Sequence, residues 1–257
     1  MLKTLSRFKP SMWILPQGVV YVGPLPPNRV HAHRALQILI SLDRAVSVDQ
    51  GRGTLSLHTK AVMIRSFIRH RVELHLAPAV VLFYEPGLLI DEQTRRESQP
   101  PLEAINLNDP EIHNNLMSLS RDSASSEVAR KVFEQVAAAA NLPLRPGSVP
   151  TTNDDRINRI LIDINNTDAH YSLKDIAEKA ALSPTRLTHL FTEETGMPLR
   201  SYLLWLKLRK ALTVLSKHRS LTDAAHEAGF SDLAHLSRTF SRTFGFSPSF
   251  LKLISMK

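Results

Sequence analysis

Histidines in the first third of the chain are the side chains best suited to binding chemistry. His31 and His33 are separated by one residue, so both imidazoles lie on one face if this segment is a strand. Neutral imidazole is a ligand for several transition metals, and such a pair can equally line a ligand pocket or form a structural cluster. The chain has no cysteine, which excludes disulfides, thiolate catalysis and cysteine-based zinc sites.

The region around the histidines has short apolar runs that are typical of β-structure. Val, Leu and Ile gather at residues 37–42, 54–58 and 80–84, with polar or turn-forming residues between the runs. This pattern predicts a small all-β sandwich or barrel within residues 1–98.

Residues 99–150 are expected to form a linker that includes one helix. Val128, Val132 and Val136 recur at helical spacing within residues 127–140. This apolar stripe is a candidate dimer contact, and it can equally pack on the preceding β-domain. Three prolines and one glycine between residues 143 and 155 predict a break before a domain at residues 151–257.

The final domain contains an internal repeat at an offset of about 48 residues. Residues 173–183 are similar to residues 221–231. After one inserted residue, the positions Leu187, Phe191 and Gly196 correspond to Leu236, Phe240 and Gly245.

Each copy has the pattern of a helix-turn-helix, at about residues 173–194 and 221–244. Gly229 suits a left-handed turn residue, and Ser183 and Ser231 are expected to cap the second helices. Residues 198–216 predict a connecting helix about 28 Å long, which compares with the ~34 Å recurrence of major-groove faces.

Positive charge is concentrated in the second copy. The chain has a formal net charge of +8, and residues 196–257 contain 10 Lys and Arg against 3 Asp and Glu. Residues 154–195 contain 5 against 8. Such a balance favours anionic partners, nucleic acid before a membrane surface. No run approaches the ~20 apolar residues of a membrane helix, so we expect no membrane partner and a cytoplasmic location.

Three segments of the second copy and four positions of the connecting helix form a specific motif. The segments are Ala228-Gly229-Phe230-Ser231-Asp232, Leu236-Ser237-Arg238-Thr239-Phe240 and Phe244-Gly245-Phe246-Ser247-Pro248, and the positions are Tyr202, Lys207, Ala211 and Leu215. With this motif, residues 154–252 resemble the DNA-binding domain of the AraC/XylS family of bacterial transcription regulators. The sequence departs from the family at His235, where Tyr or Phe is usual, and at Lys207, where Arg is usual.

The resemblance implies that the second helix of each copy faces DNA. The residues it assigns to DNA binding are Thr185, Arg186, Thr188, His189, Arg200, Ala234, His235, Ser237 and Arg238. Arg238 is the strongest candidate for base contact, because a guanidinium can donate twice to one guanine. Arg186 and Arg200 are expected to hold phosphates. The alternative for Arg238 is a solvated side chain.

The amino-terminal half resembles, more distantly, the cupin-like sensor domains of such regulators. This resemblance implies that three histidines converge inside the β-domain. The effector-pocket candidates are His31, His33, Gln37 and His70, and the histidines among them are weak candidates for metal ligands. Gln37 stands where metal-binding cupins have a carboxylate, and Phe67 and Arg65 replace a glycine and a proline of the second cupin motif. We therefore expect a ligand-lining or structural cluster, with no metal and no cofactor.

These patterns predict an α+β protein in which a small cupin-like β-domain precedes an all-α domain with two helix-turn-helix units joined by a long helix. The expected function is sequence-specific binding of double-stranded DNA by a transcription regulator, controlled by a small-molecule effector in the amino-terminal domain. A homodimer without enzymatic activity is expected, and RNA polymerase is a further candidate partner.

Two other classes of function can be tested against these patterns. A metal-dependent cupin enzyme lacks a complete ligand set and leaves the tandem repeat unexplained. A purely structural interaction protein predicts no salt-dependent DNA binding. The effector, the operator and the direction of regulation are not determined by the sequence.

Overall fold

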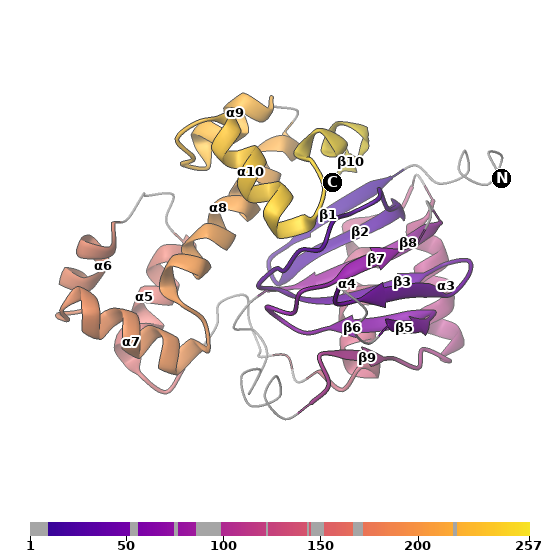
Figure 1. Cartoon of the computed structure of the whole chain (residues 1–257), viewed down its shortest axis with the longest axis horizontal. Coiled ribbons are helices and arrows are strands. Elements are labelled where there is room, and N and C mark those ends of the chain that lie inside the picture. The colour runs from indigo at the N-terminus through magenta and orange to yellow at the C-terminus, as the bar shows by residue number, and fades with distance from the viewer. Residues whose placement is uncertain are drawn as a thin grey trace.

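The computed structural model describes residues 10–51, 56–74, 77–85, 99–121, 123–142, 144, 152–166, 172–217 and 220–257. Figure 1 shows a β-domain on one side and two groups of helices on the other, connected by the long helix α8 (Leu199–Ser216). The predicted α+β class is confirmed by this architecture.

The β-domain contains a seven-stranded and a three-stranded sheet. The strand order is β10-β1-β2-β8-β3-β6-β9 in the larger sheet and β5-β4-β7 in the smaller one. The strands are β1 (Ser11–Leu15), β2 (Gly18–Pro24), β3 (Leu36–Ser41), β4 (Val46–Asp49), β5 (Ser56–Thr59), β6 (Ala61–Ile64), β7 (Arg71–Glu73), β8 (Pro78–Tyr84), β9 (Leu102–Ala104) and β10 (Ser255–Met256).

Both faces of the larger sheet are buried. In β2, Val19 and Tyr21 belong to a core shared with the smaller sheet, whereas Val20 and Val22 belong to the core on the opposite face. This division follows from the two-residue period of a strand. All six residues of β3 are buried, so this strand has an almost continuous apolar sequence.

Helices α3 (Pro110–Leu119) and α4 (Ser126–Ala139) cover the face of the larger sheet that lies away from the smaller sheet (Figure 1). Asp109 and Ser125 cap the two helices by accepting hydrogen bonds from first-turn amides. Helix α3 lies in the predicted linker and was not predicted from the sequence. Three prolines in and before this helix interrupt the helical pattern, so its short apolar stripe is hard to recognise.

The valine stripe of α4 packs on its own sheet. Val132 and Val136 are fully buried there, and Val128 packs against the same core. Of the two predicted roles for the stripe, packing on the β-domain is the one observed. A dimer contact through these valines is excluded, because the sheet already occupies that side of the helix.

The helical domain has two separate cores. Its further helices are α5 (Asp155–Asn166), α6 (Leu173–Lys179), α7 (Pro184–Thr195), α9 (Leu221–Glu227), α10 (Leu233–Phe244) and the 3₁₀ helix η1 (Pro248–Leu253). The first core joins α5, α6, α7 and the start of α8. The second core joins α9, α10 and the rest of α8, and it is continuous with the β-domain core.

The two helix-turn-helix turns have the same left-handed residue. Gly229 has φ +76°, as predicted, and Ala181 has φ +53° at the equivalent position of the first copy. A glycine adopts this conformation without strain, whereas the Cβ of alanine is crowded there. The first turn is therefore the more strained of the two.

The capping residues of the second helices differ between the copies. Ser183 caps α7 as predicted, by accepting from the amide of Arg186. The predicted cap at Ser231 is wrong: Asp232 caps α10 by accepting from the amide of His235 at 2.6 Å. The inserted residue of the second copy moves the cap by one position, and the Ser231 hydroxyl instead donates to the Asp232 carboxylate.

The carboxyl terminus returns to the β-domain. Strand β10 pairs in parallel with β1, and the amide of Ser255 donates to the carbonyl of Pro10 at 2.8 Å. None of the helices in the described ranges combines the length and apolar composition of a bilayer-spanning segment. The start of the predicted strand at residues 54–58 and most of the predicted break at residues 143–155 lie outside the described residues.

Candidate DNA-binding surface and interdomain pocket

Helix α7 separates an inward face from an outward face. Leu187, Leu190 and Phe191 are buried in the first helical core. The predicted contact residues Thr185, Arg186 and His189 are exposed, and Thr188 is half-buried. The Thr188 hydroxyl donates to the carbonyl of Pro184 at 2.8 Å. Arg200 is exposed in the first turn of α8.

Helix α10 repeats this division in the second copy. Leu236 and Phe240 are buried, whereas Ala234 and Arg238 are exposed. Ser237 and His235 are half-buried. The His235 ring contacts the edge of Phe230 with ring centroids 5.2 Å apart, and its Nδ1 lies 3.1 Å from the Ser231 hydroxyl. His235 therefore keeps the aromatic packing of the usual Tyr or Phe and adds a polar edge.

The second departure from the family motif also has a structural role. The Lys207 ammonium donates to the carbonyl of Gly229 at 2.7 Å. This bond ties the connecting helix to the turn of the second copy, which fixes the position of α10 relative to α8.

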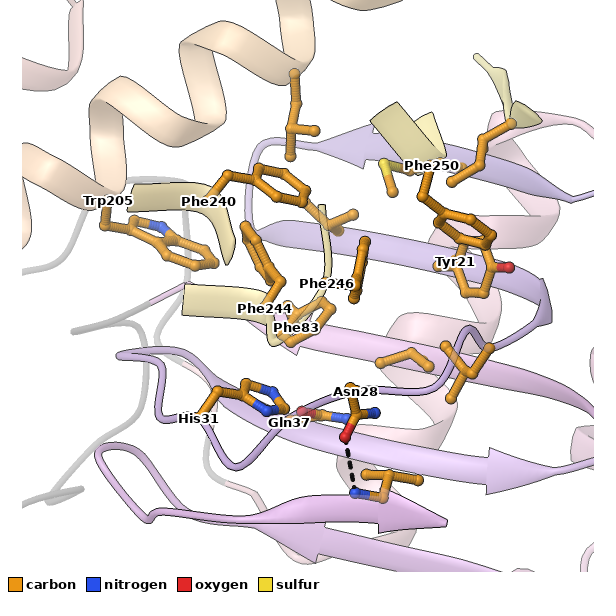
Figure 2. A pocket seen from close by; sticks show the side chains of 17 residues that line it. Tyr21, Asn28, His31, Gln37, Phe83, Trp205, Phe240, Phe244, Phe246 and Phe250 are labelled. Carbon is orange, nitrogen blue, oxygen red and sulfur yellow. Dashed lines mark hydrogen bonds between the residues drawn. The ribbon is translucent and has the colours of Figure 1, made fainter. Parts of the chain in front are cut away.

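A pocket lies between the β-domain and the second helix-turn-helix (Figure 2). Sheet residues such as Tyr21, Val81 and Phe83 form one wall, and Trp205 of α8 with four phenylalanines forms the other. These phenylalanines are Phe240, Phe244, Phe246 and Phe250. The cavity has a volume of about 50 Å³. It is therefore small, and aromatic rings make up much of its lining.

Polar groups gather at one end of the pocket. Figure 2 shows Asn28, His31 and Gln37 on the wall opposite the aromatic rings. The Asn28 amide oxygen accepts from the amide of Val72 at 3.1 Å. A predominantly apolar site with a few polar groups at one end is the usual chemistry of a small-molecule pocket.

The structure brings the four effector-pocket candidates together. His31 and Gln37 line the pocket, and His33 and His70 lie behind them. His31 and His70 pair through their backbones, with N–O distances of 2.9 and 2.8 Å. The His33 Nε2 lies 2.6 Å from the Gln37 Oε1.

Burial keeps these imidazoles neutral. It lowers the pKa of His31, lowers the pKa of His33 to about 4, and lowers the pKa of His70 well below its ordinary value. The neighbouring histidines add to the depression of the pKa for His33 and His70, because adjacent imidazolium charges repel.

The two residues that depart from the second cupin motif have clear positions. Phe67 has φ +66°, in the region that favours glycine, and its amide donates to the carbonyl of His33 at 2.8 Å. Arg65 is almost fully buried, donates to the carbonyl of Pro100 and to Gln99, and pairs with Glu103 at 3.1 Å. Phe67 thus retains the backbone geometry that a glycine would provide, and Arg65 anchors the chain before β9.

A buried ion pair joins α8 to the β-domain. The Arg209 guanidinium donates to the Glu85 carboxylate at 3.2 Å, and Glu85 is fully buried. Burial raises the pKa of Glu85, while the charge of Arg209 opposes that rise. Neither this pair nor the aromatic wall was predicted from the sequence. Five phenylalanines within residues 230–250 were a usable signal for the wall, whereas no local signal pairs residues 85 and 209.

The sequence of the second half matches known regulators. The profile of a helix-turn-helix domain family matches residues 176–252. The arabinose operon regulatory protein of Salmonella typhimurium is 32% identical over 83 residues, which cover 32% of this chain and 30% of that protein. The transcriptional activator RhaS of Citrobacter koseri is 36% identical over 98 residues, which cover 37% and 35%. The match thus spans about a third of the length of these relatives.

The similarity of structure extends over both domains. An apo form of ToxT from Vibrio cholerae superposes with a TM-score of 0.57 at 14% sequence identity, covering 92% of this chain and 97% of that one. A ToxT structure with a bound unsaturated fatty acid superposes with a TM-score of 0.54 at 13% identity, covering 92% and 95%. At this identity the likeness concerns the fold alone.

These findings identify the class of the carboxyl-terminal domain. It is a tandem helix-turn-helix domain that follows a two-sheet β-domain. Over about a third of its length, the chain is similar to transcription regulators of the AraC/XylS type.

Proposed function

We propose that the protein is a transcription regulator that binds double-stranded DNA through α7 and α10, under the control of a small molecule in the interdomain pocket. The observation that carries this proposal is the pair of exposed recognition faces, one on each helix-turn-helix, with Arg186 and Arg238 among their exposed residues. Arg238 reads a base, and Arg186 and Arg200 hold phosphates.

The proposed effector is a largely apolar molecule with one polar end. Its apolar part replaces the aromatic filling, and its polar end meets Asn28, His31 and Gln37. The bound fatty acid of ToxT supports this chemistry by analogy of fold. Phe240 and Phe244 belong to α10, so a ligand that displaces their rings also shifts the recognition helix.

Salt dependence tests the DNA part of the proposal. Labelled duplexes selected from a random pool are titrated with the full chain, and fluorescence anisotropy gives the affinity. We expect a loss of about 10³-fold or more between roughly 50 and 200 mM salt, because each phosphate contact releases a counterion. A flat salt response contradicts binding along a DNA groove.

A pocket-filling variant tests the effector part. Oleic acid serves as the probe, and the change in affinity for the selected duplex is the readout. Leu25 lines the pocket and is partly buried, so Leu25→Trp should abolish the response to the probe. Leu253→Trp is the matched control, because Leu253 is 69% exposed. Equal responses in both variants exclude this pocket as the site.

The remaining features of the proposal concern organisation. The sensor domain is cupin-like and covers residues 1–98, completed by β9, α3 and α4 from the predicted linker at residues 99–150. The DNA-binding domain covers residues 151–257. The protein acts in the cytoplasm without enzymatic activity, as a homodimer and with RNA polymerase as a candidate partner. A dimer contact has to use a surface other than the buried stripe of α4, and sedimentation of the full chain at tens of micromolar tests it.

A further inference from the structure

The three buried histidines form a compact cluster beside the pocket. Their exposed fractions are 8% for His31, 1% for His33 and 0% for His70. Ligand-capable nitrogens, one from each ring, all lie within 4.8 Å of one another. The ring centroids are 4.3 Å apart for His31 and His70, 4.9 Å for His33 and His70, and 5.7 Å for His31 and His33.

Backbone carbonyls determine which nitrogen of each ring carries the proton. The Nδ1 atoms of His31, His33 and His70 lie 2.8, 2.8 and 3.0 Å from the carbonyl oxygens of residues 29, 35 and 68. A carbonyl only accepts, so each neutral ring carries its hydrogen on Nδ1 and a lone pair on Nε2. All three rings therefore have the same tautomer.

One of these lone pairs lacks a donor. The Nε2 of His70 is buried without any hydrogen-bond partner. The Nε2 of His33 lies 2.6 Å from the side-chain amide of Gln37. A flip of that amide exchanges its oxygen and nitrogen, so Gln37 can either donate to the imidazole or turn its oxygen toward a bound ion. An unpaired buried acceptor is costly, and a cation that accepts the lone pair of His70 removes that cost.

In contrast to the expectation from the sequence, we propose that His31, His33 and His70 bind one divalent transition metal ion, such as Zn²⁺, through their Nε2 atoms. Imidazole nitrogens suit Zn²⁺, Co²⁺ and Ni²⁺. Tetrahedral Zn²⁺ with bonds of about 2.0–2.1 Å places its ligand nitrogens about 3.4 Å apart. The ligand-capable nitrogens lie within 4.8 Å of one another, so the rings have to move closer together when the ion binds. The Nδ1 hydrogen bonds orient ligating rings in the way that metal-bound histidines require.

The fourth coordination position opens toward the pocket. His31 and Gln37 line both the cluster and the pocket (Figure 2). The Gln37 amide oxygen is the protein atom that can fill this position. A water molecule or the polar end of a pocket ligand can take it instead.

The site also touches the end of the recognition helix. A Cβ added at Gly245, the residue that ends α10, would lie 2.6 Å from the His31 Nδ1. The amide of Arg29 donates to the carbonyl of Gly245 at 3.1 Å. An ion held by His31 therefore fixes the loop against which the second helix-turn-helix packs, and bound metal should raise the melting temperature of the whole chain.

Metal titration of the chelator-treated full chain tests the proposal. Calorimetry with Zn²⁺ should give one ion per chain with a Kd in the micromolar range or tighter. Co²⁺ should give the intense visible bands of a tetrahedral site, which hydrated octahedral Co²⁺ lacks. His31→Gln and His70→Gln should each weaken Zn²⁺ binding at least tenfold. His58→Gln is the matched control, because His58 lies in the smaller sheet of the same β-domain, outside the cluster, and it should leave the affinity unchanged.

Several outcomes overturn the proposal. They are no stoichiometric binding, an octahedral Co²⁺ spectrum, or equal affinities for His31→Gln and His58→Gln. The first of these would mean that ordered water satisfies the histidines. If His70→Gln fails to fold, X-ray absorption of the zinc-loaded wild-type chain decides, since it counts imidazole ligands directly and fewer than three reject the site. None of these measurements involves DNA, so they test the metal site independently of the proposed function.

Discussion

The two helix-turn-helix units share one sequence pattern but have different surroundings. Each begins with a capping box, Ser172 with Asp175 in the first and Ser220 with Asp223 in the second. The first unit packs mainly on α5 and the start of α8, in a separate core that the β-domain contacts through Phe67. The second unit shares a continuous core with the sheet of the β-domain, and Figure 1 shows α10 beside that sheet.

The difference comes from a few aromatic residues. Phe244 and Phe246 flank Gly245 in the second unit, where Thr195 and Met197 flank Gly196 in the first. Both phenylalanines contact other rings of the interdomain pocket, and Phe244 contacts Phe83 of the sheet. The same local fold thus packs largely by itself in one copy and is docked on the β-domain in the other.

The largest expected effect comes from emptying the core of each unit. Phe240→Ala and Phe191→Ala both remove a buried ring and should each cost about 3–5 kcal/mol. Urea unfolding is followed by circular dichroism and by tryptophan fluorescence. Phe191→Ala should produce an early loss of helix with little change in fluorescence, because Trp13 and Trp205 lie in the other two cores. Phe240→Ala should shift both signals together. If both variants shift the circular dichroism and fluorescence transitions in the same way, the two units do not differ in their coupling to the β-domain.

Breaking the buried ion pair should weaken the docked unit almost as strongly. Arg209→Met leaves the Glu85 carboxylate buried without its partner and should cost about 3 kcal/mol at neutral pH. Arg242→Met, at an exposed position of α10, is the control and should have little effect. Adding Glu85→Gln to Arg209→Met should restore part of the loss.

The same variant should be sensitive to pH in a defined direction. Without Arg209, only the interaction with Trp205 still opposes burial, so the folded-state pKa of Glu85 rises further above its unfolded value of 4.5. The folded state binds a proton that the unfolded state releases, so the variant is least impaired at acid pH and loses stability as pH rises through the folded pKa. Thermal melts between about pH 5 and 8 measure this trend, and a deficit independent of pH would show that the carboxyl is not the cause.

Substitutions on the recognition faces should affect DNA and not folding. Arg238→Ala should cost about 1–3 kcal/mol on the preferred duplex and relax preference at one base pair. Arg186→Ala should weaken binding to all duplexes alike, since a phosphate contact carries no sequence information. Competition binding with single-base variants of the duplex separates the two. If Arg238→Ala loses the same affinity for every duplex, Arg238 contacts a phosphate and not a base.

The smallest expected effect concerns the turns. Ala181→Gly should stabilise the first unit by about 0.5–1 kcal/mol, because glycine relieves the left-handed alanine. Gly229→Ala should destabilise the second unit by about 1 kcal/mol for the same reason. A higher melting temperature for Ala181→Gly and a lower one for Gly229→Ala would confirm that both turns have a left-handed residue at the same position. Shifts in the same direction for both variants would contradict it.

Local signals in the sequence were sufficient for the helical repeat. Capping residues, the left-handed Gly229 and the apolar spacing of α7 and α10 are encoded within a few residues of where they act. The prediction that Ser231 caps α10 was wrong, because one inserted residue makes Asp232 the capping residue. The convergence of His31, His33 and His70 was also predictable, from a distant resemblance.

Long-range contacts were not predictable in the same way. The pairing of β10 with β1 joins residues about 244 positions apart, and the Glu85–Arg209 pair joins residues 124 apart. Neither has a local pattern, because each partner is an ordinary residue until the fold brings the two together. The docking of the second unit on the sheet is also a long-range contact without a local pattern. The aromatic wall of the proposed effector pocket results from this docking, so it was not predicted either.

Hydroxyl-radical footprinting of the full chain on its preferred duplex tests the central claim most directly. If both units read DNA, two protected patches should appear about one helical turn, or roughly 10–10.5 base pairs, apart. Arg238→Ala should weaken the patch of the second unit and leave that of the first, whereas Arg186→Ala should do the reverse. A single patch, or patches that neither substitution changes, would contradict DNA reading through α7 and α10.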